Sequence, residues 1–374
     1  MKRIFSLLAT VAILTIGVLY AAAPSSQWEK MIKKGVKEVV KTFEKEVVNT
    51  VKKEYKKYEK EIEKEIDKRS TPDHKAPKVI LGSPNIKHND RQLNPAWAEL
   101  PEIVDGQNIV HKTYFTTLNN GKRVRNYSIC YDKSKMVSLW VAYPLHEVYT
   151  TPKIDRTNAW AFDDAVTTYG EGGYDIVRYE YNDPQIPQHL QPYVQKGGFN
   201  DGENRQLDRG HMLPSASRYN SWTTNAQTFY ATNIFPQNAR LNQQNWARVE
   251  DATRDCICSD TLYVVVGTLF EGSSSFVSRG RHIARPSHCY KLLLRTRNGE
   301  SGKSISEITD ADELMAIGFL YENSSAGNVE PYRAVVSIAE VERRSGIKFF
   351  PNINPTIEKQ VKEQKNITHW SGFR

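Results

Sequence analysis

Short runs of Val, Ile, Leu and aromatic residues constrain the fold more than any other feature of the chain. Runs of this kind, bounded by turn-forming residues, are typical of β-strands. They cover Ile109–Thr117, Tyr127–Tyr131, Val137–Tyr143, Thr261–Phe270, Cys289–Thr296 and Met315–Tyr321. A helical pattern around Leu241–Arg254 interrupts them, and a second one at Ala334–Ser345 ends in Gly346, a typical helix C-cap. This order predicts the α+β fold class with a central, largely antiparallel sheet.

The amino end carries an uncharged apolar run, Ile4–Ala23, behind the basic start Met1–Arg3. A run of this length fits either a secretory signal or a single membrane span. Pro24 disfavours cleavage after Ala23, whereas cleavage after Ser25 stays open. We therefore expect an exported protein, periplasmic or secreted, in which residues 1–25 are a signal peptide or a retained membrane anchor through residues 4–23.

Residues 26–71 form a Lys- and Glu-rich segment with apolar residues every three or four positions from Ile32 to Ile66. The spacing averages about 3.8 residues, which predicts a long charged amphipathic helix but not a left-handed coiled coil. This helix is interpreted as a spacer or an oligomerisation element. The alternative is that its basic face near Lys30 rests on anionic lipid or nucleic acid.

The rest of the chain divides by composition. A segment rich in Pro and Asn predicts a linker over residues 72–105, followed by a folded domain over 106–352 and a C-terminal tail over 353–374. Of the net charge of +8, Lys2 and Arg3 supply +2 and residues 27–70 supply +4, which leaves +2 for residues 71–374. Net charge therefore does not indicate a basic nucleic-acid surface on the folded domain.

The chain has four cysteines, and an even count in an exported protein permits two disulfides. The predicted strands favour a bridge from Cys289 to Cys256 or Cys258, with Cys130 left for the remaining thiol. The alternative is that the cysteines are reduced and buried.

Two polar motifs carry the candidate chemistry. Asp208-Arg209-Gly210-His211 places an acid, a base, a glycine and a histidine side by side, which alone is a weak indication of catalysis. After the segment Asn233–Gln237, a helical stretch presents Asn242, Trp246 and Glu250 at intervals of four, on one helix face. About 12 Å of axial rise separates Asn242 from Glu250, so both cannot ligate one ion directly. A strongly hydrated cation such as Mg²⁺ would suit one direct ligand and one acting through water.

The order of these motifs resembles that of the DNA/RNA non-specific endonucleases, the ββα-metal (His-Me finger) nucleases. The resemblance rests on Asp208–His211, on Asn233-Ile-x-Pro-Gln, and on Asn242, Trp246 and Glu250, and it covers roughly residues 106–352. It implies a ββα-metal nuclease with a central antiparallel sheet, preceded here by the long amphipathic N-terminal helix. Upstream, Arg156 occupies the place of a phosphate-binding arginine.

The resemblance also implies roles for these residues. His211 would be the general base that takes a proton from the attacking water, and Asn242 would be the lone protein ligand of Mg²⁺, with Mn²⁺ as a substitute ion. Glu250 would hold metal-bound waters, and Arg156 and Arg209 would neutralise the phosphate. Three further residues support the site: Asp208, which would orient Arg209 and the turn, Asn233 and Trp246.

The sequence thus predicts an exported, Mg²⁺-dependent, sugar-non-specific endonuclease that hydrolyses DNA and RNA to 5′-phosphate products. Contacts to phosphate and sugar carry no base identity, which fits a lack of sequence preference. The cations expected to bind the polymer are Arg205, Arg209, Arg218, Arg240 and Arg248. The alternatives are a nucleotide phosphodiesterase and a non-catalytic nucleic-acid-binding surface protein. A homodimer is a further expectation from the family.

Overall fold

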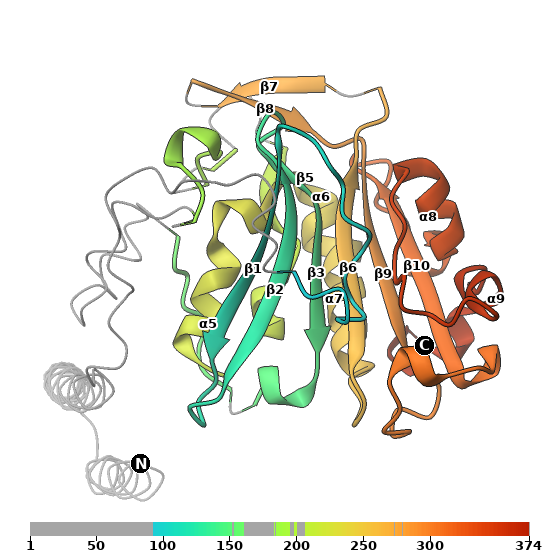
Figure 1. Cartoon of the computed structure of the whole chain (residues 1–374). Coiled ribbons are helices and arrows are strands. Elements are labelled where there is room, and N and C mark those ends of the chain that lie inside the picture. Colours follow the sequence, from blue (N-terminus) through green and yellow to red (C-terminus); the bar gives the residue numbers. More distant parts are fainter. Residues whose placement is uncertain are drawn as a thin grey trace, which may run out of the picture. The chain divides into compact units, whose positions relative to one another are not determined.

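The computed structural model describes residues 93–373, apart from 152, 161–182, 184, 195–197, 200–205, 273 and 279. Its centre is a seven-stranded sheet with the order β1-β2-β3-β6-β9-β10-β11, in which all neighbours pair antiparallel (Figure 1). The strands are β1 Ile109–Thr117, β2 Arg123–Asp132, β3 Val137–Leu145, β6 Leu262–Leu269, β9 His288–Thr296, β10 Leu314–Glu322 and β11 Val335–Val336. The six predicted strands and the antiparallel sheet are confirmed.

Two further pairs of strands lie outside this sheet and were not among the strands predicted from the residue patterns. The first pairs β4, Leu207–His211, with β5, Ile234–Asn238. The second pairs β7, Ser274–Ser278, with β8, Arg281–Arg285. Each of these strands has five residues, too short for an alternating pattern to be evident in the sequence.

A continuous helical segment follows β5 and confirms the predicted helix around Leu241–Arg254. It consists of α6, Ala239–Leu241, a π-helical turn at Asn242–Trp246, and α7, Ala247–Asp255. The other α-helices of the described residues are α5 Trp222–Ala226, α8 Ile338–Ser345 and α9 Glu358–Lys362. Short 3₁₀ turns occur at Glu147–Tyr149, Gln188–Leu190, Ser215–Ser217, Gln227–Phe229, Ala231–Asn233, Ile305–Glu307, Ala311–Glu313, Pro331–Arg333, Ile367–His369 and Ser371–Phe373.

The helix expected over Ala334–Ser345 begins four residues later than predicted. The Ser337 hydroxyl accepts a hydrogen bond from the backbone N–H of Glu340, which fixes the N-terminus of α8 at Ile338. The expected C-cap is confirmed, since Gly346 has a left-handed backbone (φ 71°) and donates its N–H to the carbonyl of Glu342. A further helix, α9, follows it.

Two hydrophobic clusters cover the two faces of the sheet. Successive side chains of a strand point to opposite faces, so Val264 and Val266 join one cluster while Val265 joins the other. The first face packs against β5 and the helical segment through Phe235, Trp246 and Val249; Figure 1 shows α7 behind the strands. The second face packs against residues of α8 and α9, Ile338, Val341 and Val361.

The folded domain is larger at both ends than the sequence indicated. Leu93, Ala98 and Leu100, in the expected linker, are buried in the core. In the expected tail, Ile353 and Trp370 are 1% exposed. The boundaries at 105 and 353 are therefore not edges of the fold, because apolar residues on both sides of them complete the covering of the sheet.

All four cysteines are free thiols, so the expected disulfides are wrong. Cys130 belongs to the cluster on one face of the sheet, whereas Cys256 and Cys289 belong to the cluster on the other. A disulfide requires Cα atoms within about 7 Å and Cβ atoms that face each other, which excludes a bridge from Cys130 through the sheet to Cys256 or Cys289. The favoured bridge from Cys289 to Cys256 or Cys258 is not formed either, since these thiols are free. The thiol of Cys289 instead accepts a hydrogen bond from Nε2 of Gln237 at 3.7 Å, and that of Cys258 donates to the carbonyl of Asp260 at 3.3 Å.

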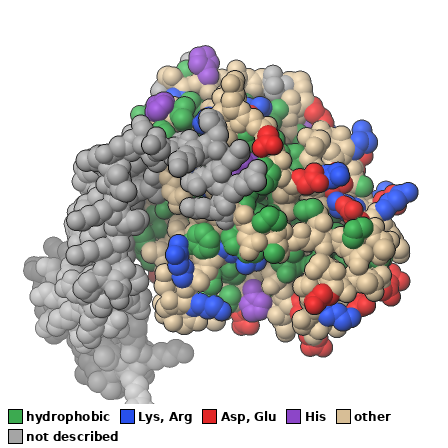
Figure 2. Space-filling model, viewed as in Figure 1, with side chains coloured by type: hydrophobic (Ala, Val, Ile, Leu, Met, Phe, Trp, Pro, Cys, Tyr) green, Lys and Arg blue, Asp and Glu red, His purple; other side chains and the backbone are tan. Residues whose placement is uncertain are grey.

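The predicted signal or anchor at residues 1–25 and the helix over 26–71 lie outside the described residues. Among the residues that the structure describes, no helix has the length and apolar character needed to cross a membrane. Figure 2 shows acidic and basic side chains interspersed over the visible face of the domain, as a net charge near zero for residues 71–374 leads one to expect.

Candidate active site

The candidate residues lie on a ββα unit formed by β4, β5 and the helical segment that follows β5. The register places His211 opposite Ile234 and Arg209 opposite Pro236. At the end of β5 the side chain of Asn238 accepts hydrogen bonds from the backbone N–H groups of Arg240 and Leu241, and so starts the helix directly. The two motifs found in the sequence are thereby brought onto neighbouring elements.

Gly210 is required by the close approach of the two strands. A Cβ atom at this position would lie 2.4 Å from Oε1 and 2.6 Å from Cβ of Gln237 on β5. Only glycine avoids this clash, which explains its place between Arg209 and His211 in the motif.

Two aromatic rings hold His211 in place. The rings of Trp160 and Phe229 lie edge-on to the imidazole, with centroids at 5.3 and 5.1 Å. The two rings also contact each other at 4.8 Å, which completes a three-ring cluster. The buried Nε2 atom of His211 has no hydrogen-bond partner among the described residues. Packing, rather than a hydrogen bond within this part of the chain, therefore orients the imidazole.

The same aromatic residues support the two arginines. The guanidinium of Arg209 lies 3.8 Å from the ring centroid of Trp160 and donates a hydrogen bond to the carbonyl of Val194. The guanidinium of Arg156 lies 5.1 Å from the ring of Phe229 and donates to Oδ1 of Asn158. Both arginines thus reach the surroundings of His211. Their binding of phosphate stays a prediction.

The charge state of His211 follows from this environment. Burial lowers its pKa well below the ordinary value of 6.5, and the positive charges of Arg156 and Arg209 lower the pKa further. The imidazole is therefore neutral near pH 7 and has a lone pair that can accept a proton.

Asp208 connects the β-ribbon to the helix. Its Oδ2 atom accepts hydrogen bonds from Nδ2 of Asn242 at 2.9 Å and from Nε2 of Gln243 at 2.8 Å. The sequence analysis expected Asp208 to orient Arg209, but the hydrogen bonds found here orient Asn242 instead. Because its amide nitrogen points to Asp208, the amide oxygen of Asn242 faces away from this carboxylate and is available as a ligand.

Glu250 is half-buried on the same helix face as Asn242 and the fully buried Trp246. Burial raises the pKa of its carboxyl, while the charges of Lys291 and Arg254 act in the opposite direction. The side chain has no ion pair within 4.0 Å among the described residues. The carboxylate of Glu250 is therefore influenced by the charges of Lys291 and Arg254 and by a contact with the Trp246 side chain, and no ion pair within 4.0 Å with another described residue occupies its oxygens.

Asn233 braces the chain just after His211. Its Nδ2 atom donates to the carbonyls of Leu213 and Thr228, and its Oδ1 atom accepts the N–H of Leu213 at 2.9 Å. Since Asn233 is fully buried, these hydrogen bonds fix the backbone that leaves β4. Its role as a supporting residue of the site stays a prediction.

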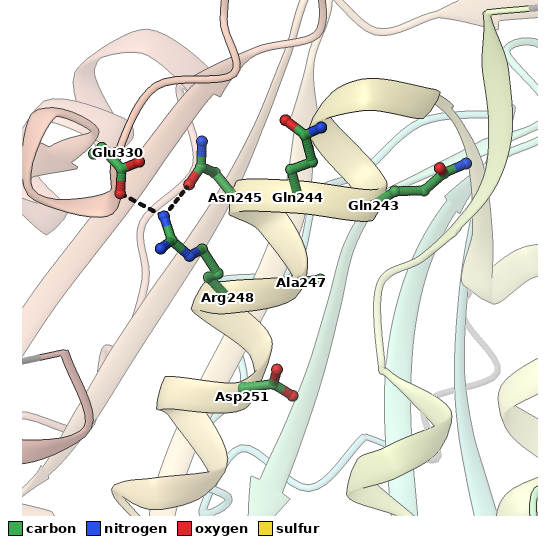
Figure 3. Close-up of a pocket in the computed structure, with 7 residues that line it drawn as sticks. All are labelled: Gln243, Gln244, Asn245, Ala247, Arg248, Asp251 and Glu330. Carbon is green, nitrogen blue, oxygen red and sulfur yellow. Dashed lines mark hydrogen bonds and ion pairs between the residues drawn. The ribbon is translucent and has the colours of Figure 1, made fainter.

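The expected cluster of phosphate-binding arginines is only partly present. Arg218 is 0% exposed and donates hydrogen bonds to Asn126 and to the carbonyl of Pro144, so it is a structural residue. Arg248 lies in a polar pocket on the outer side of the helix and donates to Glu330 at 2.6 Å and to Asn245 (Figure 3). Arg240 is exposed, and Arg205 lies outside the described residues.

The sequence analysis missed four residues of this region: Trp160, Phe229, Gln243 and Lys291. Trp160, Phe229 and Lys291 are distant along the chain from the site residues that they contact, and Gln243 is not one of the expected motif residues. For Gln243 the indication was present, because it directly follows Asn242.

The residues fit a hydrated divalent cation with a single amide ligand. The described residues contain no group of three or more His, Cys, Asp and Glu side chains placed to hold a metal. The oriented amide oxygen of Asn242 is a hard oxygen donor of the kind that Mg²⁺ accepts together with several waters.

Comparison with known proteins agrees with this arrangement. The profile of the family described as DNA/RNA non-specific endonuclease matches residues 106–356. A nuclease of Nostoc sp. is 28% identical over 158 residues, covering 42% of this chain and 55% of the relative. The mitochondrial nuclease EXOG of Xenopus laevis is 27% identical over 247 residues, covering 61% of this chain and 58% of the relative. The chain thus spans a little over half the length of these two relatives.

A crystal structure of an EndoG/EndoGI complex contains a chain that is 22% identical, with a TM-score of 0.45 and coverage of 64% of this chain and 89% of that chain. The profile match extends over more than half of the sequence. This chain therefore belongs to the DNA/RNA non-specific endonuclease family.

Proposed function

We propose that the protein is an exported, Mg²⁺-dependent, sugar-non-specific endonuclease that hydrolyses phosphodiester bonds of DNA and RNA to 5′-phosphate products. The observation that carries this proposal is that a neutral His211, the cation of Arg209 and the oriented amide of Asn242 lie on one ββα unit, with the cation of Arg156, from the chain between β3 and β4, beside His211. A base, phosphate-binding cations and a metal ligand are together the parts that phosphodiester hydrolysis requires.

His211 acts as the general base that removes a proton from the attacking water. A strongly lowered pKa makes a weak base, so the free site is not yet tuned for this step. A phosphate group bound between Arg156 and Arg209 brings negative charge close to the imidazole and offsets the two cations that depress its pKa. Substrate binding itself then raises the pKa of His211 towards the pH at which the enzyme works.

Asn242 holds the Mg²⁺ ion, or Mn²⁺ in its place, through its amide oxygen. When bound, the ion supplies a positive charge that stabilises the charge developing on the phosphoryl and leaving oxygens. Asp208 keeps the amide in the required orientation through the hydrogen bond at 2.9 Å. Glu250 offers a carboxylate to the waters of the ion.

The lack of preference between DNA and RNA follows from the groups that line the site. Arg156 and Arg209 bind phosphate oxygens, which DNA and RNA share and which carry no base identity. Because the net charge of residues 71–374 is close to zero, affinity depends on these local cations and falls steeply with salt.

The test is digestion of plasmid DNA and of ribosomal RNA by the full chain, with and without Mg²⁺, beside His211→Ala. We expect metal-dependent loss of both polymers and a decrease of roughly 10²-fold or more in the variant, as removal of a general base produces. His282→Ala, which changes an exposed histidine on β8, serves as the matched control and should retain full activity.

Other outcomes separate the alternatives. Hydrolysis of small nucleotide diesters with intact polymers would indicate a phosphodiesterase. Retardation of both polymers on a gel without cleavage would indicate a non-catalytic nucleic-acid-binding protein, and either result would overturn the proposed endonuclease.

A further inference from the structure

Lys291 is a lysine placed in the centre of the sheet. It lies on β9, between Val266 of β6 and Phe319 of β10, and is 0% exposed. Lysine is almost never fully buried unless it is paired, because removing an ammonium from water costs several kcal/mol. The position of Lys291 therefore calls for a compensating partner.

Its side chain lies on the face of the sheet that packs against the catalytic helix. The alternation along β9 puts Lys291 on the same face as Cys289 and Leu293, both of which join the cluster containing Trp246. The Nζ atom lies 5.1 Å from the ring centroid of Trp246, which is four residues after Asn242 and four before Glu250. Nζ has no hydrogen-bond partner among the described residues.

Lys291 and Glu250 are each the main opposite charge for the other. Burial lowers the pKa of Lys291 to about 8, and the charge of Glu250 is the strongest influence that raises it. In turn, Lys291 is the strongest influence that lowers the pKa of Glu250 against the effect of burial.

The other charges around Glu250 are less suited to this role. Arg254 is on the same helix, but it donates a hydrogen bond to Asp251 and is shared with that carboxylate. Arg156 lies beside His211 within the phosphate site, although Glu250 also influences its pKa. Lys291 is thus the fully buried cation on the sheet side of Glu250, where water cannot replace it.

We propose that Lys291 is a positioning residue for Glu250, and that its buried ammonium keeps the Glu250 carboxylate charged and in place on the helix face that carries Asn242. The effect of Lys291 on cleavage rests on the proposed function, in which a charged Glu250 holds the waters of the metal ion. The pairing itself does not depend on catalysis and can be measured separately.

The pairing is tested by a double-mutant cycle on the metal-free full chain, with thermal unfolding as the measurement. Lys291→Met and Glu250→Gln are each expected to lower Tm by about 4 °C or more, because each leaves one charge buried without its partner. The double variant removes both charges and should recover most of this loss. Additive losses in the double variant would show that the two side chains are not coupled and would overturn the proposal.

If Lys291→Met does not fold alone, coupling predicts that adding Glu250→Gln restores folding. A double variant that still fails to fold counts against the pairing. Leu293→Ala, on the same face of β9, is the matched control, since its loss of stability should simply add to that of Glu250→Gln.

The consequence for the site is measured as the Mg²⁺ concentration that gives half-maximal cleavage. Loss of a residue that supports the surroundings of a metal typically weakens metal binding by 10–100-fold, so Lys291→Met should raise this concentration by about tenfold or more. Leu293→Ala should leave it unchanged. An equal Mg²⁺ requirement in the two variants would overturn the positioning role. If the wild type cleaves neither polymer, the proposed function fails, while the unfolding cycle still decides the pairing.

Discussion

Oδ2 of Asp208 and Nδ2 of Asn242 are joined by a hydrogen bond of 2.9 Å that links strand β4 to the helical segment. The same carboxylate oxygen accepts a second hydrogen bond, from Gln243. Asp208 immediately precedes Arg209 in the chain, yet it orients Asn242, a residue 34 positions further on. The amide oxygen of Asn242 owes its orientation to this contact.

Removal of that contact should weaken metal binding. In Asp208→Ala the amide of Asn242 is free to rotate, so we expect the Mg²⁺ concentration for half-maximal cleavage to rise about 10- to 100-fold. Gln243→Ala, which removes the other hydrogen bond to Asp208 but leaves Asn242 in place, is the control and should change this value little. Equal Mg²⁺ requirements in the two variants would contradict the role given to Asp208.

The stability of the protein should fall as the pH falls below about 6.5. In the unfolded chain the imidazole of His211 has a pKa of about 6.5, whereas burial and the cations of Arg156 and Arg209 lower its pKa well below this value in the fold. Between the two values the unfolded chain binds more protons, so the free energy of unfolding decreases as the pH is lowered through this range.

Urea unfolding at pH 7.5 and 5.5 measures this effect. His211→Gln removes the titrating group and should lose less stability than the wild type over this interval, while His282→Gln should behave as the wild type does. An identical pH dependence of wild type and His211→Gln would show that His211 is not the group responsible.

Trp160 should contribute to catalysis although the motifs do not include it. Its ring supports the guanidinium of Arg209 at 3.8 Å and contacts His211 edge-on. In Trp160→Leu we expect kcat/KM to fall about tenfold, since a desolvated cation–π contact contributes up to about 2 kcal/mol. Trp97→Leu removes a similar contact, to Arg125 at 5.0 Å on the other face of the sheet, and should leave kcat/KM unchanged.

The main features of the fold were predictable because they depend on local patterns. The apolar runs Val137–Leu145 and Leu262–Leu269 form strands in the structure, and their side chains point to both faces of the sheet. The helix that carries Asn242, Trp246 and Glu250 was likewise evident from their spacing.

Contacts between distant residues were not predictable in this way. Lys291 stands in a run of apolar residues, where a single lysine ordinarily marks the solvent side of a strand. Here both faces of the sheet are covered, so the same residue is buried. Arg218 was expected to bind phosphate because a charged side chain ordinarily lies at the surface. No local pattern indicated that Asn126 and the carbonyl of Pro144 would accept its hydrogen bonds in the interior.

The state of the cysteines provides a direct test of the fold. Burial raises the pKa of all four thiols, that of Cys289 to about 12, and only Cys258 is partly exposed. A thiol reagent such as DTNB should therefore modify about one thiol in the native protein and all four after denaturation. Cys258→Ser should abolish the native reaction, and a reducing agent should leave Tm unchanged. Fewer than four reactive thiols in the denatured, unreduced protein would reveal a disulfide and contradict the free state of the four cysteines.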